Sequence, residues 1–280
     1  MATAPNISFE FFPPKNMGAA FGLFETVNAL HSTHPSFVSV TYGAGGTTRT
    51  LTHEAVELLH KKFDLNVAAH LTCVDATRAE TLEIANAYAD AGVTEIVALR
   101  GDPPKDKGQF EPHEDGFANS VELIEALAET GRFTLRVGAY PDPHPEAADE
   151  NADVLWLKRK FEAGADSAIT QFFFEPDTFF RFRDRAASEG ITGKIIPGIL
   201  PIVSLGGLKR FAATCGMTVP THIEEAFDAA GNDSEALSID LSTKLCERLI
   251  EGGVEDLHFY TLNRPGLSKA VLANLGIAGA

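Results

Sequence analysis

Cysteine is scarce in this chain of 280 residues, which contains Cys73, Cys215 and Cys246 and no others. The number is odd, and no two cysteines have the CxxC spacing. A disulfide framework and a cysteine zinc site are therefore not expected. The histidines do not suggest a metal site either, because no carboxylate nearby in sequence completes one. We therefore expect surface positions for His31, His34, His53 and His60.

Basic residues are also few, since 23 Lys and Arg stand against 39 Asp and Glu and give a formal net charge of −16. Such an acidic chain is not expected to bind nucleic acid or an anionic membrane. An anionic ligand would need a local basic cluster or helix N-termini. The amino-terminal stretch MATAPNISFE has no basic, apolar signal region, and no long uncharged apolar run occurs, so the expected location is the cytoplasm.

Short β-branched or aromatic runs alternate with longer helical patterns along the whole chain. Eight runs predict strands at residues 7–12, 37–42, 66–72, 95–101, 134–140, 167–174, 194–200 and 256–262. Helical patterns occupy residues 21–32, 50–63, 78–92, 119–131, 152–164, 176–190, 206–216, 235–253 and 267–276, and residues 220–231 predict one extra helix before the last unit.

Eight such units without a domain-scale linker predict a single α/β domain over residues 1–280, a (β/α)8 TIM barrel. A doubly wound open sheet is the alternative fold. It is disfavoured because FFPPKNMG, and not GxGxxG, follows the first predicted strand. A P-loop is also missing. The longest stretch without periodicity, residues 101–118, follows the fourth strand and is expected at the face of the barrel where catalytic loops gather.

Polar side chains end many of the predicted strands. They are Glu10, Thr41, His70, Arg100, Asp102, Tyr140, Gln171, Tyr260 and Arg264. Each has a plain structural alternative: His70 as a core histidine, Gln171 as a cap of a sheet edge, and Arg100 with Asp102 as a local ion pair. Because the carboxyl ends of barrel strands meet at one mouth, the whole set predicts an active site there.

Glu10 raises a particular question, because it stands between Phe9 and Phe11 in a run that predicts a buried strand. Burial of an ionised carboxylate is unfavourable by several kcal/mol unless the group is paired or neutralised. Glu10 could point to solvent or pair with a basic residue. Alternatively, surrounding aromatic side chains, including Phe12, could keep it protonated as a catalytic acid.

Two further stretches could bind an anion. Residues 157–160 (LKRK) form the densest basic cluster, and we expect Arg159 and Lys160 to meet phosphates while Lys158 is solvated; the alternative is a solvated helix face. Residues 42–50 (YGAGGTTRT) form a glycine-rich loop that could cradle a phosphate or lie against a flat ring.

The chain resembles the methylenetetrahydrofolate reductase family over nearly its whole length. The stretches that carry the resemblance, in order, are SFEFFPPK, FVSVTYGAGG, HLTCVDAT, IVALRGDPP, YPDPHPEA, LKRKFEAGADSAITQFFF, IIPGILPI and FYTLNR. The resemblance implies a (β/α)8 barrel that holds FAD without a Rossmann motif. It also implies a homo-oligomer and a catalytic domain alone, as in bacterial forms of the family.

The resemblance assigns roles residue by residue. Glu10 matches the general acid, and Asp102 matches the carboxylate between flavin and folate. The substrate-binding residues of the family correspond to Gln171, Phe211, Tyr260 and Arg264. The FAD-binding residues of the family correspond to Thr41, His70, Arg100, Asp102, Tyr140, His144, Asp153, Arg159 and Lys160. Phe211 is expected to stack on the aminobenzoate ring of folate. Trp156 is a departure, because a related enzyme has an asparagine near the cofactor at this position.

The implied reaction belongs to one-carbon metabolism and methionine biosynthesis. NADH or NADPH gives hydride to FAD and leaves, and 5,10-methylenetetrahydrofolate then occupies the same flavin face. Protonation of N10 by Glu10 opens the imidazolidine ring, and the iminium carbon accepts hydride to give 5-methyltetrahydrofolate. An ionised Asp102 would stabilise the cation.

Two other functions stay open at this point. One is another flavin barrel, such as a proline-dehydrogenase-like oxidoreductase, although Gln171 and Phe211 suit a pterin and an aromatic ring better than a small amine. The other is a barrel that binds folate without redox chemistry. The sequence does not decide between NADH and NADPH.

Overall fold

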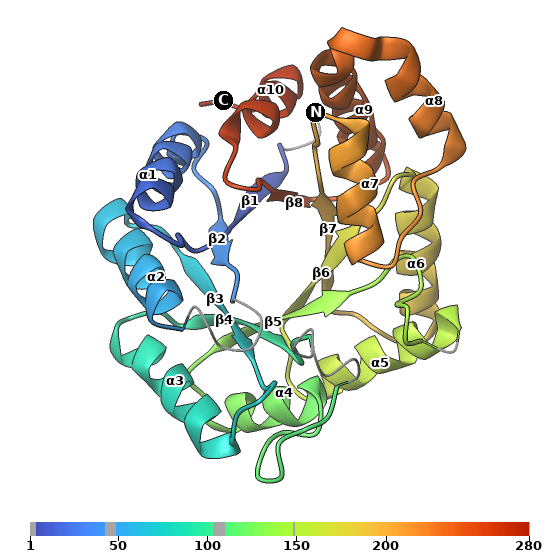
Figure 1. Cartoon of the computed structure of the whole chain (residues 1–280). Helices are drawn as coiled ribbons and strands as arrows, with labels where there is room; N and C mark the ends of the chain where they lie inside the picture. Colours follow the sequence, from blue (N-terminus) through green and yellow to red (C-terminus); the bar gives the residue numbers. More distant parts are fainter. Residues whose placement is uncertain (1–3, 43–48, 103–109, 148, 280) are drawn as a thin grey trace.

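Eight parallel strands form a closed barrel in the described part of the chain, which is residues 4–42, 49–102, 110–147 and 149–279 of a computed structural model. The strands are β1 (Asn6–Phe11), β2 (Phe37–Val40), β3 (Val67–Thr72), β4 (Glu95–Leu99), β5 (Thr134–Ala139), β6 (Ser167–Phe172), β7 (Lys194–Ile199) and β8 (Asp256–Tyr260). Each pairs with its neighbours in sequence, and β8 pairs with β1 to close the ring (Figure 1). The (β/α)8 barrel is therefore confirmed.

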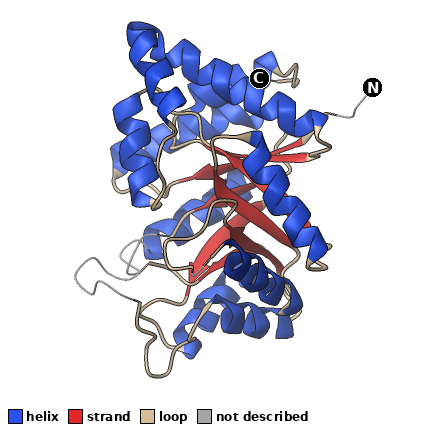
Figure 2. Ribbon diagram, turned by 90° about the vertical axis from the view of Figure 1, so that its right-hand side faces the viewer, coloured by secondary structure: helices blue, strands red, loops and turns tan. Residues whose placement is uncertain are grey.

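Helices cover the outside of the strands (Figure 2). They are α1 (Met17–His31), α2 (Arg49–Phe63), α3 (Arg78–Asp90), α4 (Ser120–Glu129), α5 (Glu150–Glu162), α6 (Pro176–Ser188), α7 (Leu205–Thr214), α8 (Thr221–Ala230), α9 (Ser234–Glu251) and α10 (Pro265–Asn274). Side chains cap several amino ends; Thr77 and Glu80 form a reciprocal capping box at α3, for example. The extra helix expected at residues 220–231 is α8, which lies between α7 and α9 in the connection from β7 to β8.

The alternation of side chains along β1 separates Glu10 from its aromatic neighbours. Phe9 and Phe11 are buried in the core between β1 and the surrounding helices, whereas Phe12 is 38% exposed beyond the strand. Glu10 faces the barrel interior, where it meets His70 of β3. Successive side chains of a strand point to opposite faces, so the expectation that these phenyl rings surround the Glu10 carboxyl group is wrong.

The barrel interior changes character along its axis. An apolar layer fills the middle and consists of Phe37, Ala68, Val97, Ile169 and Ile196. Polar groups lie at the amino ends of the strands on one side of this layer and at the carboxyl ends on the other. In (β/α)8 barrels the amino end serves stability and the carboxyl end carries the active site.

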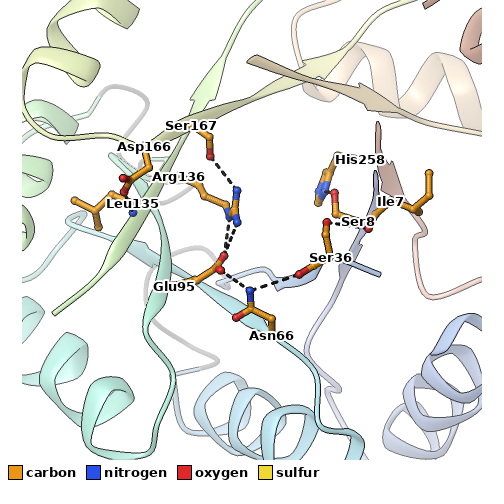
Figure 3. Close-up of polar contacts among 10 residues, drawn as sticks. All are labelled: Ile7, Ser8, Ser36, Asn66, Glu95, Leu135, Arg136, Asp166, Ser167 and His258. Carbon is orange, nitrogen blue, oxygen red and sulfur yellow. Dashed lines mark hydrogen bonds and ion pairs between the residues drawn. The ribbon is translucent and has the colours of Figure 1, made fainter. Parts of the chain in front are cut away.

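At the amino end, Arg136 joins a set of polar groups that we call the barrel floor: Asn66, Glu95, Arg136 and Ser167 (Figure 3). Arg136 Nη2 lies 2.6 Å from Glu95 Oε2, and Arg136 Nη1 donates to Ser167 Oγ at 2.9 Å. The Asn66 amide donates to the Glu95 carboxylate, and the guanidinium of Arg136 lies 3.7 Å from the ring centroid of Phe37. The buried ion pair therefore has additional hydrogen-bond and aromatic partners, which offset the cost of burying its charges.

Glu95→Gln should destabilise the protein by about 3–5 kcal/mol, because it leaves the buried Arg136 charge without its counter-ion. Urea unfolding would measure the change. Asp90→Asn is the matched control: Asp90 pairs with Arg132 but is 72% exposed, so its loss should change stability by less than about 1 kcal/mol. Equal effects of the two substitutions would contradict a stabilising role for the floor.

Candidate active site

Glu10 and His70 lie on β1 and β3 and face each other inside the carboxyl end of the barrel. Glu10 Oε2 is 3.3 Å from His70 Nε2, but the two atoms are not aligned as a hydrogen bond. The buried Nε2 of His70 has no hydrogen-bond partner among the described residues. The Glu10 side chain is 16% exposed, so its carboxyl group is shielded on most sides and still accessible to a ligand at the mouth.

Tyr260, the last residue of β8, is held firmly beside Glu10. Its hydroxyl donates to the Thr170 carbonyl oxygen at 2.6 Å, and its ring lies on Gly198 of β7. A Cβ at position 198 would come within 2.5 Å of the Tyr260 ring and 2.3 Å of the Thr170 oxygen, so only glycine fits there. Burial, reinforced by the charge of Glu10, raises the pKa of Tyr260 well above its usual value and keeps the phenol neutral.

Arg100 pairs with Glu146 and not with Asp102, the local partner considered from the sequence. Its two terminal nitrogens lie 2.6 and 3.2 Å from the Glu146 carboxylate oxygens, and its guanidinium lies 4.8 Å from the ring centroid of Phe110. The hydrogen bond that Arg100 donates to Glu146 is the largest cause of the raised pKa of Arg100. Asp102 is exposed at the mouth, free of an ion pair within the described residues.

The backbone turns sharply between Arg100 and Asp102. Gly101 has φ +86°, and a Cβ there would meet Val74 and Thr72 at 2.8 and 2.9 Å. A glycine is therefore required at this turn, which sends Asp102 toward the mouth. Residues 103–109 of the expected catalytic loop (101–118) and residues 43–48 of the glycine-rich stretch lie outside the described residues.

Tyr140, His144 and Asp153 lie together beyond β5. The Tyr140 and His144 rings meet edge to face, with centroids 4.7 Å apart, and the His144 backbone N–H donates to Asp153 Oδ2 at 2.7 Å. Burial raises the pKa of Tyr140 to about 12, and Asp102 adds to the shift. Burial also raises the pKa of Asp153. Three residues expected from the sequence to share a site are thus neighbours.

The basic cluster on α5 divides between two faces of the helix. Lys160 is only 7% exposed, and its Nζ donates to the Gly138 carbonyl oxygen at 2.7 Å. Burial lowers the pKa of Lys160 to about 8, partly offset by Asp153. Arg159 is exposed instead, and its guanidinium lies 5.6 Å from the ring centroid of Trp156. The two cations therefore do not form one phosphate clamp within the described geometry.

The other expected residues lie around the same mouth. Gln171 Oε1 accepts the Phe172 backbone N–H at 3.0 Å, and Phe211 of α7 packs on the Phe172 ring with centroids 5.7 Å apart. The Thr41 backbone N–H donates to the Phe11 carbonyl oxygen at 3.0 Å. Arg264 is exposed at the start of α10. Gln171 and Phe211 thus share Phe172 as a neighbour.

Several contributing residues were not singled out from the sequence. Glu146 pairs with Arg100 and Thr170 binds Tyr260, and such pairing over long sequence distances leaves no local signal. Gly198, in the run KIIPGIL, was a possible signal because glycine in a strand often marks a close approach. Asn263 was a second one, since it follows the last strand directly, in TLNR.

Within the described ranges, no group of three or more His, Cys, Asp or Glu side chains could hold a metal ion. His31 and His60 instead bind backbone carbonyl oxygens, and His53 stacks on Tyr88 with ring centroids 5.0 Å apart. None of the described helices is long and apolar enough to cross a membrane.

A closed (β/α)8 barrel with acidic, basic and phenolic side chains gathered at the carboxyl ends of its strands has the arrangement of a barrel enzyme. Sequence comparison then identifies the family. The profile described as "Methylenetetrahydrofolate reductase" matches residues 2–276. The chain belongs to this family.

Curated relatives agree with the profile. The chain is 42% identical to the 5,10-methylenetetrahydrofolate reductase of Escherichia coli strain K12 over 275 residues, which cover 97% of this chain and 91% of that protein. It is 41% identical over 275 residues to the same enzyme of Pectobacterium carotovorum, with coverage of 97% and 90%.

A solved structure is also similar: an uncharacterized protein from Clostridium thermocellum that binds two copies of 5-methyl-5,6,7,8-tetrahydrofolic acid. Its TM-score is 0.62 at 14% identity, and the match covers 98% of this chain and 94% of that one. At this identity the likeness shows the fold alone.

Gly198→Ala should destabilise the protein by about 1–3 kcal/mol, because the new methyl group overlaps Tyr260 and the Thr170 carbonyl. Thermal unfolding and tyrosine absorbance would report the loss and the displaced phenol. Gly22→Ala on α1 is the control, because its Cβ meets nothing within 4 Å. A Gly198→Ala protein as stable as the Gly22→Ala protein would show that Tyr260 is not fixed by this contact.

Proposed function

We propose that the protein reduces 5,10-methylenetetrahydrofolate to 5-methyltetrahydrofolate with NADH or NADPH, by a ping-pong reaction that uses FAD. The observation that carries the proposal is Glu10, an interior carboxyl group accessible at the mouth of a barrel that belongs to the methylenetetrahydrofolate reductase family. The proposal further includes a single catalytic domain that forms a homo-oligomer in the cytoplasm.

The residues at the mouth suit FAD in two respects. The buried His70 Nε2 lies 3.3 Å from Glu10 Oε2 but makes no hydrogen bond among the described residues, so it is available to hydrogen-bond a ligand. Lys160 places a buried positive charge near the mouth, and its ammonium group has donors beyond the one used by Gly138. The residues proposed to hold FAD are Thr41, His70, Arg100, Asp102, Tyr140, His144, Asp153, Arg159 and Lys160. When bound, FAD accepts hydride from the nicotinamide and passes it to the folate.

Glu10 is proposed as the general acid for the folate. The imidazolidine ring of the substrate opens when N10 takes a proton, which leaves an iminium at N5 whose carbon can accept hydride. The Glu10 carboxyl group gives its proton to N10 and becomes a carboxylate, which takes a new proton from water after the product leaves. A shielded acid close to N10 favours this transfer, because the donor and the acceptor are already positioned.

Other residues of the mouth are proposed to bind and orient the folate. Gln171 presents an amide for the pterin, and Phe211 presents a ring for the aminobenzoate group. Tyr260 and Arg264 line the same side, and Tyr260 remains a neutral phenol because its pKa is raised by burial. Asp102, exposed and close to Tyr140, would stabilise the cationic iminium as a carboxylate.

FAD binding should weaken above pH 8 because of Lys160. Its pKa of about 8 means that the side chain is charged at pH 7 and increasingly neutral at higher pH. An anionic ligand favours the charged form, so the FAD dissociation constant should rise by up to about tenfold per pH unit above that value. Fluorescence titration with FAD between pH 7 and pH 9 would measure it.

Lys160→Met should weaken FAD binding about 10- to 100-fold at pH 7 and flatten the pH dependence. Lys158→Met, on another face of α5, is the control and should change neither the FAD affinity nor its pH dependence. An unchanged pH dependence in Lys160→Met would exclude Lys160 as the group responsible. The melting temperature of each FAD-free variant separates a lost contact from a lost fold.

Glu10→Gln should separate the two halves of the reaction. Glutamine has similar shape but cannot supply the proton, so oxidation of the reduced flavin by methylenetetrahydrofolate should slow by about 10²–10⁴-fold. Flavin reduction by NAD(P)H needs no proton from Glu10 and should stay within about tenfold of its original rate. Anaerobic stopped-flow absorbance measures each half-reaction.

Glu25→Gln, on the exposed side of α1, is the matched control and should change neither rate. If Glu10→Gln slowed both half-reactions equally, Glu10 would position the flavin and would not be the acid. If it slowed neither, another group would protonate N10.

A further inference from the structure

The chain takes an unusual path directly after β8. Leu262 and Asn263 both have left-handed backbone conformations, with φ of 49° and 54°. Such conformations are unfavourable for residues other than glycine, and Leu262 has no side-chain oxygen or nitrogen that would bind the backbone locally. Two consecutive ones persist only when surrounding contacts hold them.

One such contact is the side chain of Asn263, which binds the backbone of Phe12 at two points. The Phe12 N–H donates to Asn263 Oδ1 at 2.9 Å, and Asn263 Nδ2 donates to the Phe12 carbonyl oxygen at 2.9 Å. A carboxamide offers one acceptor and one donor side by side, as the backbone of a neighbouring strand does. Asn263 therefore continues the pairing of β8 with β1 beyond the point where the chain has left the sheet.

Thr261 binds the backbone of Glu10, which lies on β1 two residues before Phe12. Its Oγ1 donates to the Glu10 carbonyl oxygen at 2.7 Å and accepts the Asn263 backbone N–H at 3.1 Å. The Asn263 carbonyl oxygen in turn accepts from Thr26 of α1 at 3.0 Å. Glu10 and Phe12 are thus held from the β8 side by one connected set of hydrogen bonds, which we call the Asn263 latch: Thr26, Thr261, Asn263 and the backbone of Glu10 and Phe12.

The same turn also contacts an apolar wall of the mouth. Leu262 packs against the apolar cluster of Phe172 and Ile202, which Phe211 also contacts. The same turn therefore directs one side chain to β1, next to Glu10, and the preceding one to the wall where Phe211 lies. A displacement of this turn would change the distance between the carboxyl group and any ligand held against that wall.

We propose that Asn263 is a positioning residue for proton transfer from Glu10: its carboxamide fixes the end of β1 and thereby places the Glu10 carboxyl group relative to the folate. This inference rests on the proposed function. Small misplacements of a catalytic group reduce rates strongly, by about 10²-fold for a shift of 1 Å. The effect should be confined to the folate half-reaction, because hydride transfer from NAD(P)H does not use the Glu10 proton.

Asn263→Gly is the test, because glycine tolerates the left-handed backbone and removes only the side chain. The folate half-reaction at saturating substrate should slow about 10- to 100-fold, while flavin reduction by NAD(P)H stays within about threefold. Asn263→Asp, which keeps the acceptor for the Phe12 N–H and loses the donor, should give an intermediate defect. His34→Gly places glycine at another left-handed, exposed position (φ 50°) and should change neither rate.

A double-mutant cycle with Glu10→Gln shows whether Asn263 acts through Glu10. In the Glu10→Gln background, Asn263→Gly should cause no further loss in the folate half-reaction, because the acid that it positions is gone. The melting temperature and the dissociation constant for 5-methyltetrahydrofolate are measured for each variant. Neither quantity should change in proportion to the loss of rate.

The outcomes are distinct. Equal slowing of both half-reactions, or the same loss in the presence and absence of Glu10, would make Asn263 a structural residue only and overturn the inference. If Asn263→Gly does not fold, Asn263→Asp decides by the same criteria. Wild-type protein whose reduced flavin is not oxidised by methylenetetrahydrofolate overturns the proposed function itself, whatever the variants do.

Discussion

The parallel pairing of β1 with β8, from Asn6 beside Asp256 to Glu10 beside Tyr260, turns an open sheet into a closed barrel. Because this seam joins the two ends of the sheet, it also places Glu10 next to Tyr260 and opposite His70. The Asn263 latch extends the seam into the loops at the mouth. A slip of the seam by one residue would turn Glu10 out of the barrel and bring a phenyl ring in, since side chains alternate along a strand.

The interior layers assign separate tasks to the two ends of the barrel. At the floor, the charge of Arg136 is matched by Glu95 and by a further hydrogen bond to Ser167. At the mouth, the His70 Nε2 makes no hydrogen bond among the described residues and Lys160 retains spare donors. Polar groups that are unsatisfied within the protein are costly unless a ligand or water completes them. The free hydrogen-bonding capacity of His70 and Lys160 supports the mouth as the place where an anionic, polar ligand binds.

Much of the fold could be predicted from the sequence, because each strand and helix carries its own periodicity and the eightfold alternation leaves few architectures. The gathering of Glu10, His70 and Tyr260 at one mouth followed from the fold. The directions of individual side chains were harder to predict. Glu10 was expected among phenyl rings, but Phe9 and Phe11 face the helices. On α5, consecutive residues such as Arg159 and Lys160 point about 100° apart. The Arg100–Glu146 pair and the Asn263–Phe12 bonds join residues 46 and 251 positions apart and have no local signal.

Anaerobic titration of the purified protein tests the central claim most directly. The account predicts a yellow protein whose flavin absorbance is bleached by NADH or NADPH and restored by methylenetetrahydrofolate, with one 5-methyltetrahydrofolate formed for each flavin reoxidised. A colourless protein that cannot be reconstituted with FAD, yet binds 5-methyltetrahydrofolate, would contradict it and identify a folate-binding barrel without redox chemistry.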